Sequence, residues 1–113
     1  MTQRSVDSGN FPLTVWLNVT RGDIQRAQAL RGMSSHVFSY AERCPLALVA
    51  SDTLGYRDVI VGNCVTVLRH GKMVAKYALS EAARDLRDMF DAEKFDEIEP
   101  TSVKIIRVAT WDE

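Results

Sequence analysis

One cysteine in this chain stands where a helix could activate it. Cys44 directly precedes Pro45, and proline is favoured in the first turn of a helix, so we expect Cys44 at the N-cap. A thiol at that position sees the positive end of the helix dipole, which stabilises a thiolate. Pro45 offers no backbone N–H, however, and the nearest candidate base is His36, eight residues upstream. We therefore favour a buried structural thiol at position 44. An enzyme that uses the Cys44 thiol is the third of our functional hypotheses, after the two binding functions given below.

The sequence shows no other catalytic or metal-binding pattern. Cys64 has no CxxC or HxxxH companion, and His36 and His70 are distant from each other and from both cysteines, which argues against zinc. A P-loop, a GxGxxG after a strand and a DxD pair are all missing from the sequence. We predict no catalytic residue, no cofactor and no metal site.

An acidic segment lies near the C-terminal end. Residues 90–113 contain three Lys/Arg and seven Asp/Glu, whereas residues 1–89 contain eleven and eight. The segment lacks the ligand spacing and the central glycine of an EF-hand. A solvated connection is the simplest interpretation, but the segment could also contact a partner protein. The candidate partner-binding carboxylates are Asp91, Glu93, Asp96, Glu97 and Glu99.

Two further groups could contact other molecules. The "RHGK" stretch predicts a hairpin turn, and its charged neighbourhood could touch a phosphate or an acidic partner. Trp16 lies on the face of its strand opposite an aliphatic row, so it is exposed if no helix covers that face, and exposed tryptophan is enriched at interfaces. Trp111 has the same ambiguity. The candidate ligand-binding residues of the hairpin are Arg69, His70, Lys72 and Lys76.

Composition limits the class of protein. The chain has 113 residues, 46% of them apolar and 26% charged, with a net charge of −1, as expected for one globular domain. It is too weakly basic for a dedicated nucleic-acid binder. No apolar run approaches the roughly 20 residues that span a bilayer, and residues 1–10 lack the apolar region of a signal peptide. We expect a cytoplasmic protein.

Residue periodicity predicts the order β-α-α-β-β-β-α-β. The expected fold class is α+β: a single small domain, with a mixed, mostly antiparallel sheet of about five strands packed by two or three helices. Residues 1–10 are expected to be a flexible N-terminus and residues 11–113 the domain. In the last strand we expect Ile106 and Val108 to face the core. Strand order is left open. The expected strands are 13–20, 59–62, 64–69, 73–79 and 102–110, and the expected helices are 21–31, 45–54 and 81–92.

The chain resembles a group of small proteins encoded by bacteriophages and actinobacteria. That group carries a Cys-Pro-x-Ala helix and a Phe-Asp at the end of its second long helix, which are here Cys44-Pro45-Leu46-Ala47 and Phe90-Asp91. The resemblance covers roughly residues 13–108 and departs in the longer 31–43 stretch and in the acidic "AEKFDEIEP". No biochemical activity is assigned to that group, so it supplies no site residues. It implies a phage or prophage accessory protein.

These observations favour binding over catalysis. The first hypothesis is a phage-type accessory protein that binds a host protein, such as an inhibitor of a defence protein, in the cytoplasm of a bacterial host. Trp16 and the acidic segment would form its contact surface. The alternative is a homo-oligomeric binder that sequesters a small anionic ligand, such as a nucleotide, through the 69–76 hairpin or the helix terminus at Cys44.

Overall fold

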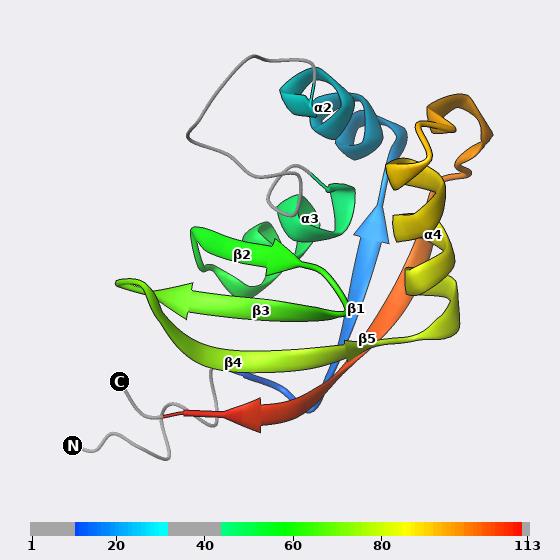
Figure 1. Ribbon diagram of the computed structural model, residues 1–113. Helices are drawn as coiled ribbons and strands as arrows, with labels where there is room; N and C mark the ends of the chain where they lie inside the picture. Colours follow the sequence, from blue (N-terminus) through cyan, green and yellow to red (C-terminus); the bar gives the residue numbers. More distant parts are fainter. Residues whose placement is uncertain (1–10, 32–43, 112–113) are drawn as a thin grey trace.

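The computed structural model describes residues 11–31 and 44–111 and confirms the expected element order (Figure 1). The flexible N-terminus expected over residues 1–10 and the stretch 32–43 lie outside the described residues. The elements are β1 (Thr14–Val19), α2 (Arg21–Arg31), α3 (Pro45–Leu54), β2 (Asp58–Val61), β3 (Cys64–Arg69), β4 (Lys72–Leu79), α4 (Glu81–Asp91), the short 3-10 helix η2 (Phe95–Glu97) and β5 (Thr101–Thr110).

The five strands form one curled sheet in the order β1-β5-β4-β3-β2, and every pairing is antiparallel. The first and last strands of the chain are therefore neighbours, and their pairing closes nearly the whole sequence into one domain. The fold is α+β, as expected, with a wholly antiparallel sheet. Two register shifts, at Val67/Leu68 and Lys76/Tyr77, interrupt the ladders of β4. Such bulges increase local twist and so contribute to the curl.

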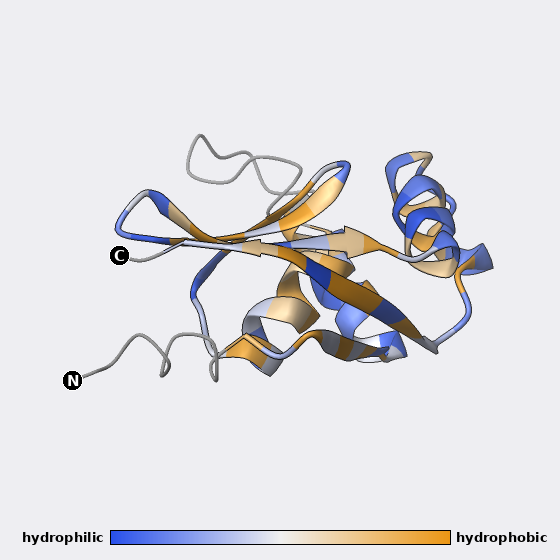
Figure 2. Ribbon diagram, turned by 90° about the horizontal axis from the view of Figure 1, so that it is seen from below, coloured by the Kyte–Doolittle hydropathy of each residue, from blue (hydrophilic) through white to orange (hydrophobic). Residues whose placement is uncertain are grey.

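The helices enclose one hydrophobic core with the inner face of the sheet: α3 packs directly on the strands, α2 packs on α3, and α4 packs against β4, β5 and α3 (Figure 1). Figure 2 shows α2 and α3 beneath the strands and α4 beside their ends. Helix α3 is apolar almost throughout and lies against β1 and β2, whereas α4 covers β4 and β5. None of the described helices is long and apolar enough to cross a bilayer. The buried strand residues on this inner face are Val15, Leu17, Val19, Val59, Val61, Val65, Val67, Ala75, Tyr77, Leu79, Val103 and Ile105.

The helix ends follow local sequence signals. Before α2, the backbone N–H of Thr20 donates to Asp23 Oδ2 at 2.9 Å, and the backbone N–H of Asp23 donates to Thr20 Oγ1 at 3.2 Å. This reciprocal pair is a capping box that satisfies N–H groups without helical partners. Helix α3 ends at Gly55, whose φ of 79° lies in the left-handed region. Ser80 caps α4 by accepting from the N–H of Ala83.

The expected hairpin is confirmed between β3 and β4. His70 and Gly71 both have positive φ, 53° and 79°. Positive φ at both central residues is the mark of a type I′ turn, whose twist matches that of the strands it joins.

The prediction that Ile106 and Val108 of the last strand face the core is wrong. Ile106 is 42% exposed and Val108 is 56% exposed, whereas Val103 and Ile105 are buried. The reason is pairing: Val103 and Ile105 lie opposite Leu17 and Val15 of β1, so they share the inner face. Residues on the two faces of β5 alternate along the strand, and each of the two sets contains aliphatic residues and one basic residue. Figure 2 shows the resulting bands of hydrophobic and hydrophilic residues along this strand. Periodicity alone therefore could not choose the buried phase.

Tyr77 links the centre of the sheet to the segment before β1. Its side chain is fully buried, and its hydroxyl donates to the carbonyl oxygen of Pro12 at 2.7 Å. Arg107, its cross-strand neighbour, donates to the carbonyl oxygen of Phe11 at 2.7 Å. Burial raises the pKa of Tyr77 to about 12, against an opposing contribution from the Arg107 charge.

This burial predicts a loss of stability at high pH. The pKa is higher in the folded state than the 10.0 of an ordinary tyrosine. The unfolded chain therefore releases the proton first, and stability that is complete below pH 10 is lost as the pH rises toward 12. Relative to Tyr77→Phe, we expect the wild-type free energy of unfolding to fall by an extra ~1.4 kcal/mol per pH unit in this range. Urea unfolding from pH 9 to 12 measures it, and parallel curves for the two proteins would contradict the assignment.

Candidate functional site

The outer face of the sheet, opposite the helices, exposes Trp16. This side chain is 61% exposed, which settles the ambiguity that the sequence left. Its cross-strand partner is Lys104 of β5, whose Nζ lies 5.9 Å from the centre of the indole ring. An ammonium group at this distance is attracted by the face of the ring. The contact holds the exposed tryptophan beside a positive charge in the middle of β1.

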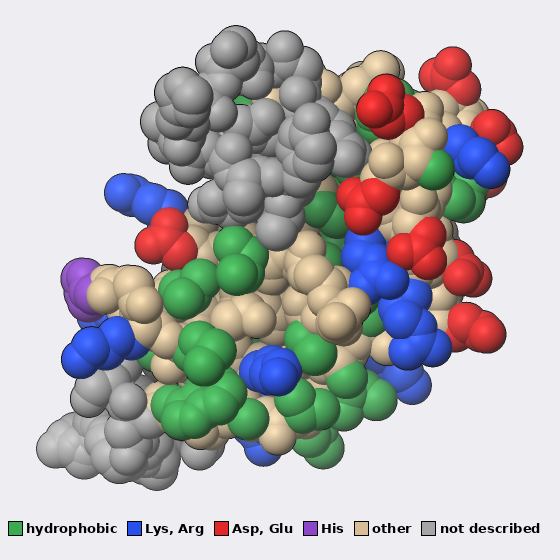
Figure 3. Space-filling view, in the orientation of Figure 1, with side chains coloured by type: hydrophobic (Ala, Val, Ile, Leu, Met, Phe, Trp, Pro, Cys, Tyr) green, Lys and Arg blue, Asp and Glu red, His purple; other side chains and the backbone are tan. Residues whose placement is uncertain are grey.

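Apolar side chains continue across the outer face from Trp16. The register places Ile106 beside Ala78, and Ala78 beside Cys64. Further along the strands, Leu68 lies opposite Met73, which is 49% exposed. Figure 3 shows hydrophobic side chains gathered over β3 and β4 around a basic group. We call this set the outer face: Trp16, Ile60, Cys64, Thr66, Leu68, Met73, Lys76, Ala78, Lys104 and Ile106.

The charges of the outer face are mainly positive. Lys76 lies between Thr66 of β3 and Ala109 of β5, and Lys104 lies beside Trp16. Asp58, at the beginning of β2, is the carboxylate that the register places on this side, opposite Leu68. The outer face is therefore an apolar surface with two lysines within it and one acid at its margin.

The acidic segment lies at another part of the molecule. Residues 91–99, the acidic segment, run from Asp91 at the end of α4 through η2 to the chain before β5, and Figure 3 shows acidic side chains gathered there. The structure thus does not bring Trp16 and the acidic segment into one cluster: the tryptophan is in the middle of β1, and the segment lies beyond the strand ends where Val19 pairs with Thr101. All five candidate carboxylates are exposed: Asp91, Glu93, Asp96, Glu97 and Glu99.

Buried side chains and hydrogen bonds from Arg21 hold the backbone of the acidic segment in place. Ile98 is buried, and the rings of Phe90 and Phe95 meet edge to face with centroids 4.9 Å apart. The Arg21 guanidinium donates to the carbonyl oxygens of Phe95 and Ile98, at 3.4 and 2.7 Å. Glu93 takes a positive φ of 61°, which is unusual for a residue with a side chain. The segment is thus an anchored loop that holds its carboxylates outward.

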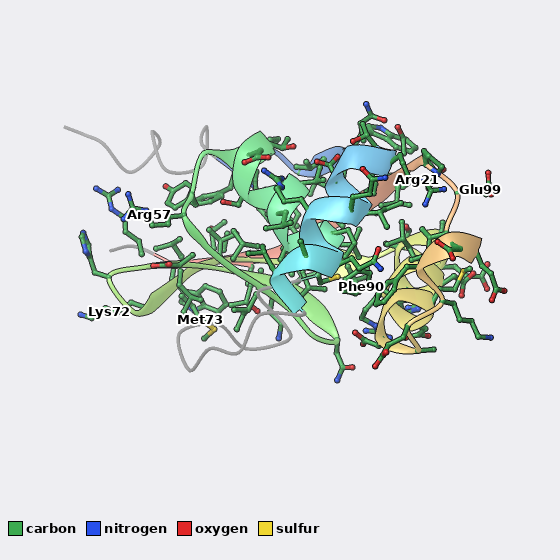
Figure 4. All side chains as sticks on the ribbon, turned by 90° about the horizontal axis from the view of Figure 1, so that it is seen from above. Arg21, Arg57, Lys72, Met73, Phe90 and Glu99 are labelled. Atoms are coloured by element: carbon green, nitrogen blue, oxygen red, sulfur yellow. The ribbon has the colours of Figure 1, made fainter. Side chains whose placement is uncertain are left out.

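A pocket lies at the opposite end, between the C-terminus of α3 and the β3–β4 hairpin. Its volume is about 560 Å³. Of the four hairpin residues proposed from the sequence, Arg69 and His70 line it, Lys72 begins β4 beside the turn, and Lys76 lies on the outer face instead. Figure 4 shows Arg57 and Lys72 at this end and Arg21 and Glu99 at the other. The lining residues are Leu54, Gly55, Tyr56, Arg57, Asp58, Leu68, Arg69 and His70.

Sequence reasoning missed Arg57, although a signal for it was present. The strands on either side of Gly62-Asn63 were both expected, and Arg57 directly precedes the first of them, near the end where Asp58 pairs with Leu68 and Arg69 follows. The two arginines therefore share one end of the β2–β3 pair.

Cys44 is the N-cap of α3, as expected, and it is buried. The candidate base His36 lies outside the described residues. Neither cysteine forms a disulfide. Within residues 11–31 and 44–111, no group of three His, Cys, Asp or Glu side chains is placed to hold a metal ion. Cys44 is part of the hydrophobic core at the beginning of α3.

Comparisons with protein families, with curated proteins and with solved structures found no match for this chain.

The anchoring of the acidic segment can be tested at Arg21. In Arg21→Ala, two carbonyl oxygens lose a charged donor, so we expect the free energy of unfolding to fall by about 1–3 kcal/mol and amide exchange over residues 93–99 to accelerate. Arg26→Ala is the matched control, because Arg26 is an exposed arginine of the same helix that pairs only with Asp23 and Asp52 among the described residues. Equal exchange over residues 93–99 in the two variants would contradict the anchoring role.

Proposed function

We propose that this chain is a binding domain that engages another protein through the outer face of its sheet. One observation supports the proposal above the others: α3 and α4 pack against the inner face, while the outer face exposes Trp16, 61% accessible, together with further apolar side chains. Contiguous exposed apolar surface commonly marks an interaction site. The proposed function is therefore recognition rather than catalysis.

Trp16 is the proposed anchor of the interface. Tryptophan is among the residues most enriched at energetic hot spots, because it buries a large area with little loss of side-chain freedom. Its neighbours Ile106 and Ala78 are apolar and lie on regular strands, so they present a fixed shape to a partner. Binding to a fixed surface costs less conformational entropy than binding to a flexible one.

The two lysines of the outer face favour a partner with an apolar surface bordered by carboxylates. A second copy of the chain is the weaker candidate, because a two-fold dimer brings the same patch of both subunits together. Lys76 and Lys104 of each copy would then face a surface with the same positive charges. Complementary charge across an interface favours the correct partner and disfavours like-charged ones.

The acidic segment has a second role in this proposal. Its anchored carboxylates are at a distance from Trp16, so they would attract a basic region of the partner rather than fill the same contact. Long-range attraction of this kind raises the rate of association and weakens as salt is added.

The wider biological role follows from the sequence resemblance alone. On that basis the chain would be a phage-encoded accessory protein in the cytoplasm of a bacterial host. Its partner would then be a host protein, such as a defence protein that it inhibits.

The outer-face proposal predicts a large effect at Trp16. We expect Trp16→Ala to weaken partner binding by about 2 kcal/mol or more, which is roughly 30-fold. Because the side chain is already largely exposed, the variant should fold normally. The measurement is capture from bacterial lysate followed by calorimetry on the protein captured.

Leu13→Ala is the matched control for this experiment. Leu13 is a comparably exposed apolar residue, 58% accessible, that lies just outside β1 in the phase of the inner face. Retention of the partner by Leu13→Ala and its loss by Trp16→Ala would support the outer face. A partner that both variants bind equally well would contradict it.

A separate prediction concerns the acidic segment. The test is a triple variant, Asp96→Lys, Glu97→Lys and Glu99→Lys. We expect it to associate with the partner more slowly at low salt, with little change in the rate of dissociation. Stopped-flow mixing at two ionic strengths measures both rates. Association that is equally fast in the variant, at both ionic strengths, would remove the segment from the recognition surface.

A further inference from the structure

We propose that the pocket between the end of α3 and the β3–β4 hairpin binds a small phosphorylated ligand. The pocket borders the outer face, with which it shares Leu68 and the marginal Asp58, but the proposal does not depend on the outer-face interface. The pocket's volume, about 560 Å³, is within the usual range for small-molecule sites. Its walls combine two guanidinium groups with apolar side chains, which suits an anionic group attached to an apolar body.

The two arginines line the same pocket from neighbouring segments. Arg69 is the last residue of β3, and Arg57 lies in the bend directly before β2, next to the pairing of Asp58 with Leu68. Guanidinium groups form charge-assisted hydrogen bonds with phosphate oxygens, and two of them can contact one phosphate group.

Arg57 is available to a ligand. It is exposed, and it makes no hydrogen bond or ion pair with any residue of the described chain. Figure 4 shows it at the same end of the molecule as Lys72, so the surroundings add a further positive charge. Asp58 is the one carboxylate among the lining residues, which include Arg57 and Arg69.

Contacts with Phe11 and Ser51 hold the apolar wall of the pocket in place. Tyr56 stacks on the buried ring of Phe11 with centroids 5.0 Å apart. The backbone N–H of Tyr56 donates to the carbonyl oxygen of Ser51 at 3.2 Å, and the Ser51 hydroxyl donates to the carbonyl oxygen of Tyr56. Together with Leu54 and Leu68, this fixed wall suits a flat apolar group. A phosphomonoester with an aromatic body, the chemistry of a nucleoside monophosphate, fits both halves of the pocket.

The test uses the whole chain and three probes: inorganic phosphate, AMP and adenosine. Thermal unfolding and calorimetry are measured for the wild type, Arg57→Gln and Arg69→Gln. Arg84→Gln is the control, because it removes the same charge from the exposed side of α4. Specific ligands raise Tm by mass action, so we expect AMP well above its Kd to raise the wild-type Tm by about 2 °C or more, and adenosine to leave it unchanged.

The variants decide whether the pocket is responsible. We expect Arg57→Gln and Arg69→Gln each to weaken AMP binding about tenfold or more, and Arg84→Gln to bind as the wild type does. The proposal is overturned if neither phosphate nor AMP shifts Tm, or if Arg57→Gln keeps the full AMP shift. Equal shifts from inorganic phosphate and AMP would overturn the contribution assigned to the apolar wall.

Discussion

The register of β1 against β5 is the constraint on which the rest of the structure depends. Leu17 lies opposite Val103 and Trp16 opposite Lys104, and this choice decides which side of both strands meets the helices. A slip of β1 by one residue would exchange the two faces of that strand, because side chains alternate along a strand. It would turn Trp16 toward the core and expose Leu17. The same pairing joins the two ends of the domain, so the register also fixes where α2 begins and where the acidic segment meets Arg21. The apolar outer face is thus a consequence of how the core is built.

The described surface divides into three regions of different chemistry. The basic pocket and the acidic segment lie at opposite ends of the molecule, as Figures 3 and 4 show, and the apolar outer face lies on the sheet between them. A net charge of −1 conceals this separation. A partner that contacts the outer face would meet an electrostatic gradient along it, which favours one orientation of docking over its reverse. A ligand bound beside Arg57 would change the charge at one end of that gradient. The two proposed sites could therefore influence each other through charge without any change of fold.

Local signals allowed much of the fold to be predicted from the sequence. The Thr20–Asp23 capping box, the Pro45 and Gly55 boundaries of α3 and the His70-Gly71 turn each depend on a few adjacent residues, whose conformational preferences act without tertiary context. Strand order, the exposure of Trp16 and the buried phase of β5 depend on partners far away in the sequence. For β5, both phases carried aliphatic residues and one basic residue, so only pairing with β1 could choose between them. Arg57 is an intermediate case: the strand that follows it was expected from the sequence, but its place in one pocket with Arg69 depends on how that strand pairs with β3.

The central claim is that Trp16 is open to solvent in the intact chain, and collisional quenching of its fluorescence tests this most directly. Trp111→Phe leaves Trp16 as the only tryptophan, and acrylamide is the suitable quencher because it is neutral and does not respond to Lys104. The account predicts quenching of the folded protein by at least half as much as that of a free indole, with emission close to that of tryptophan in water. A shielded signal, with blue-shifted emission and weak quenching that recovers only on unfolding, would show that the outer face is covered and would contradict the account.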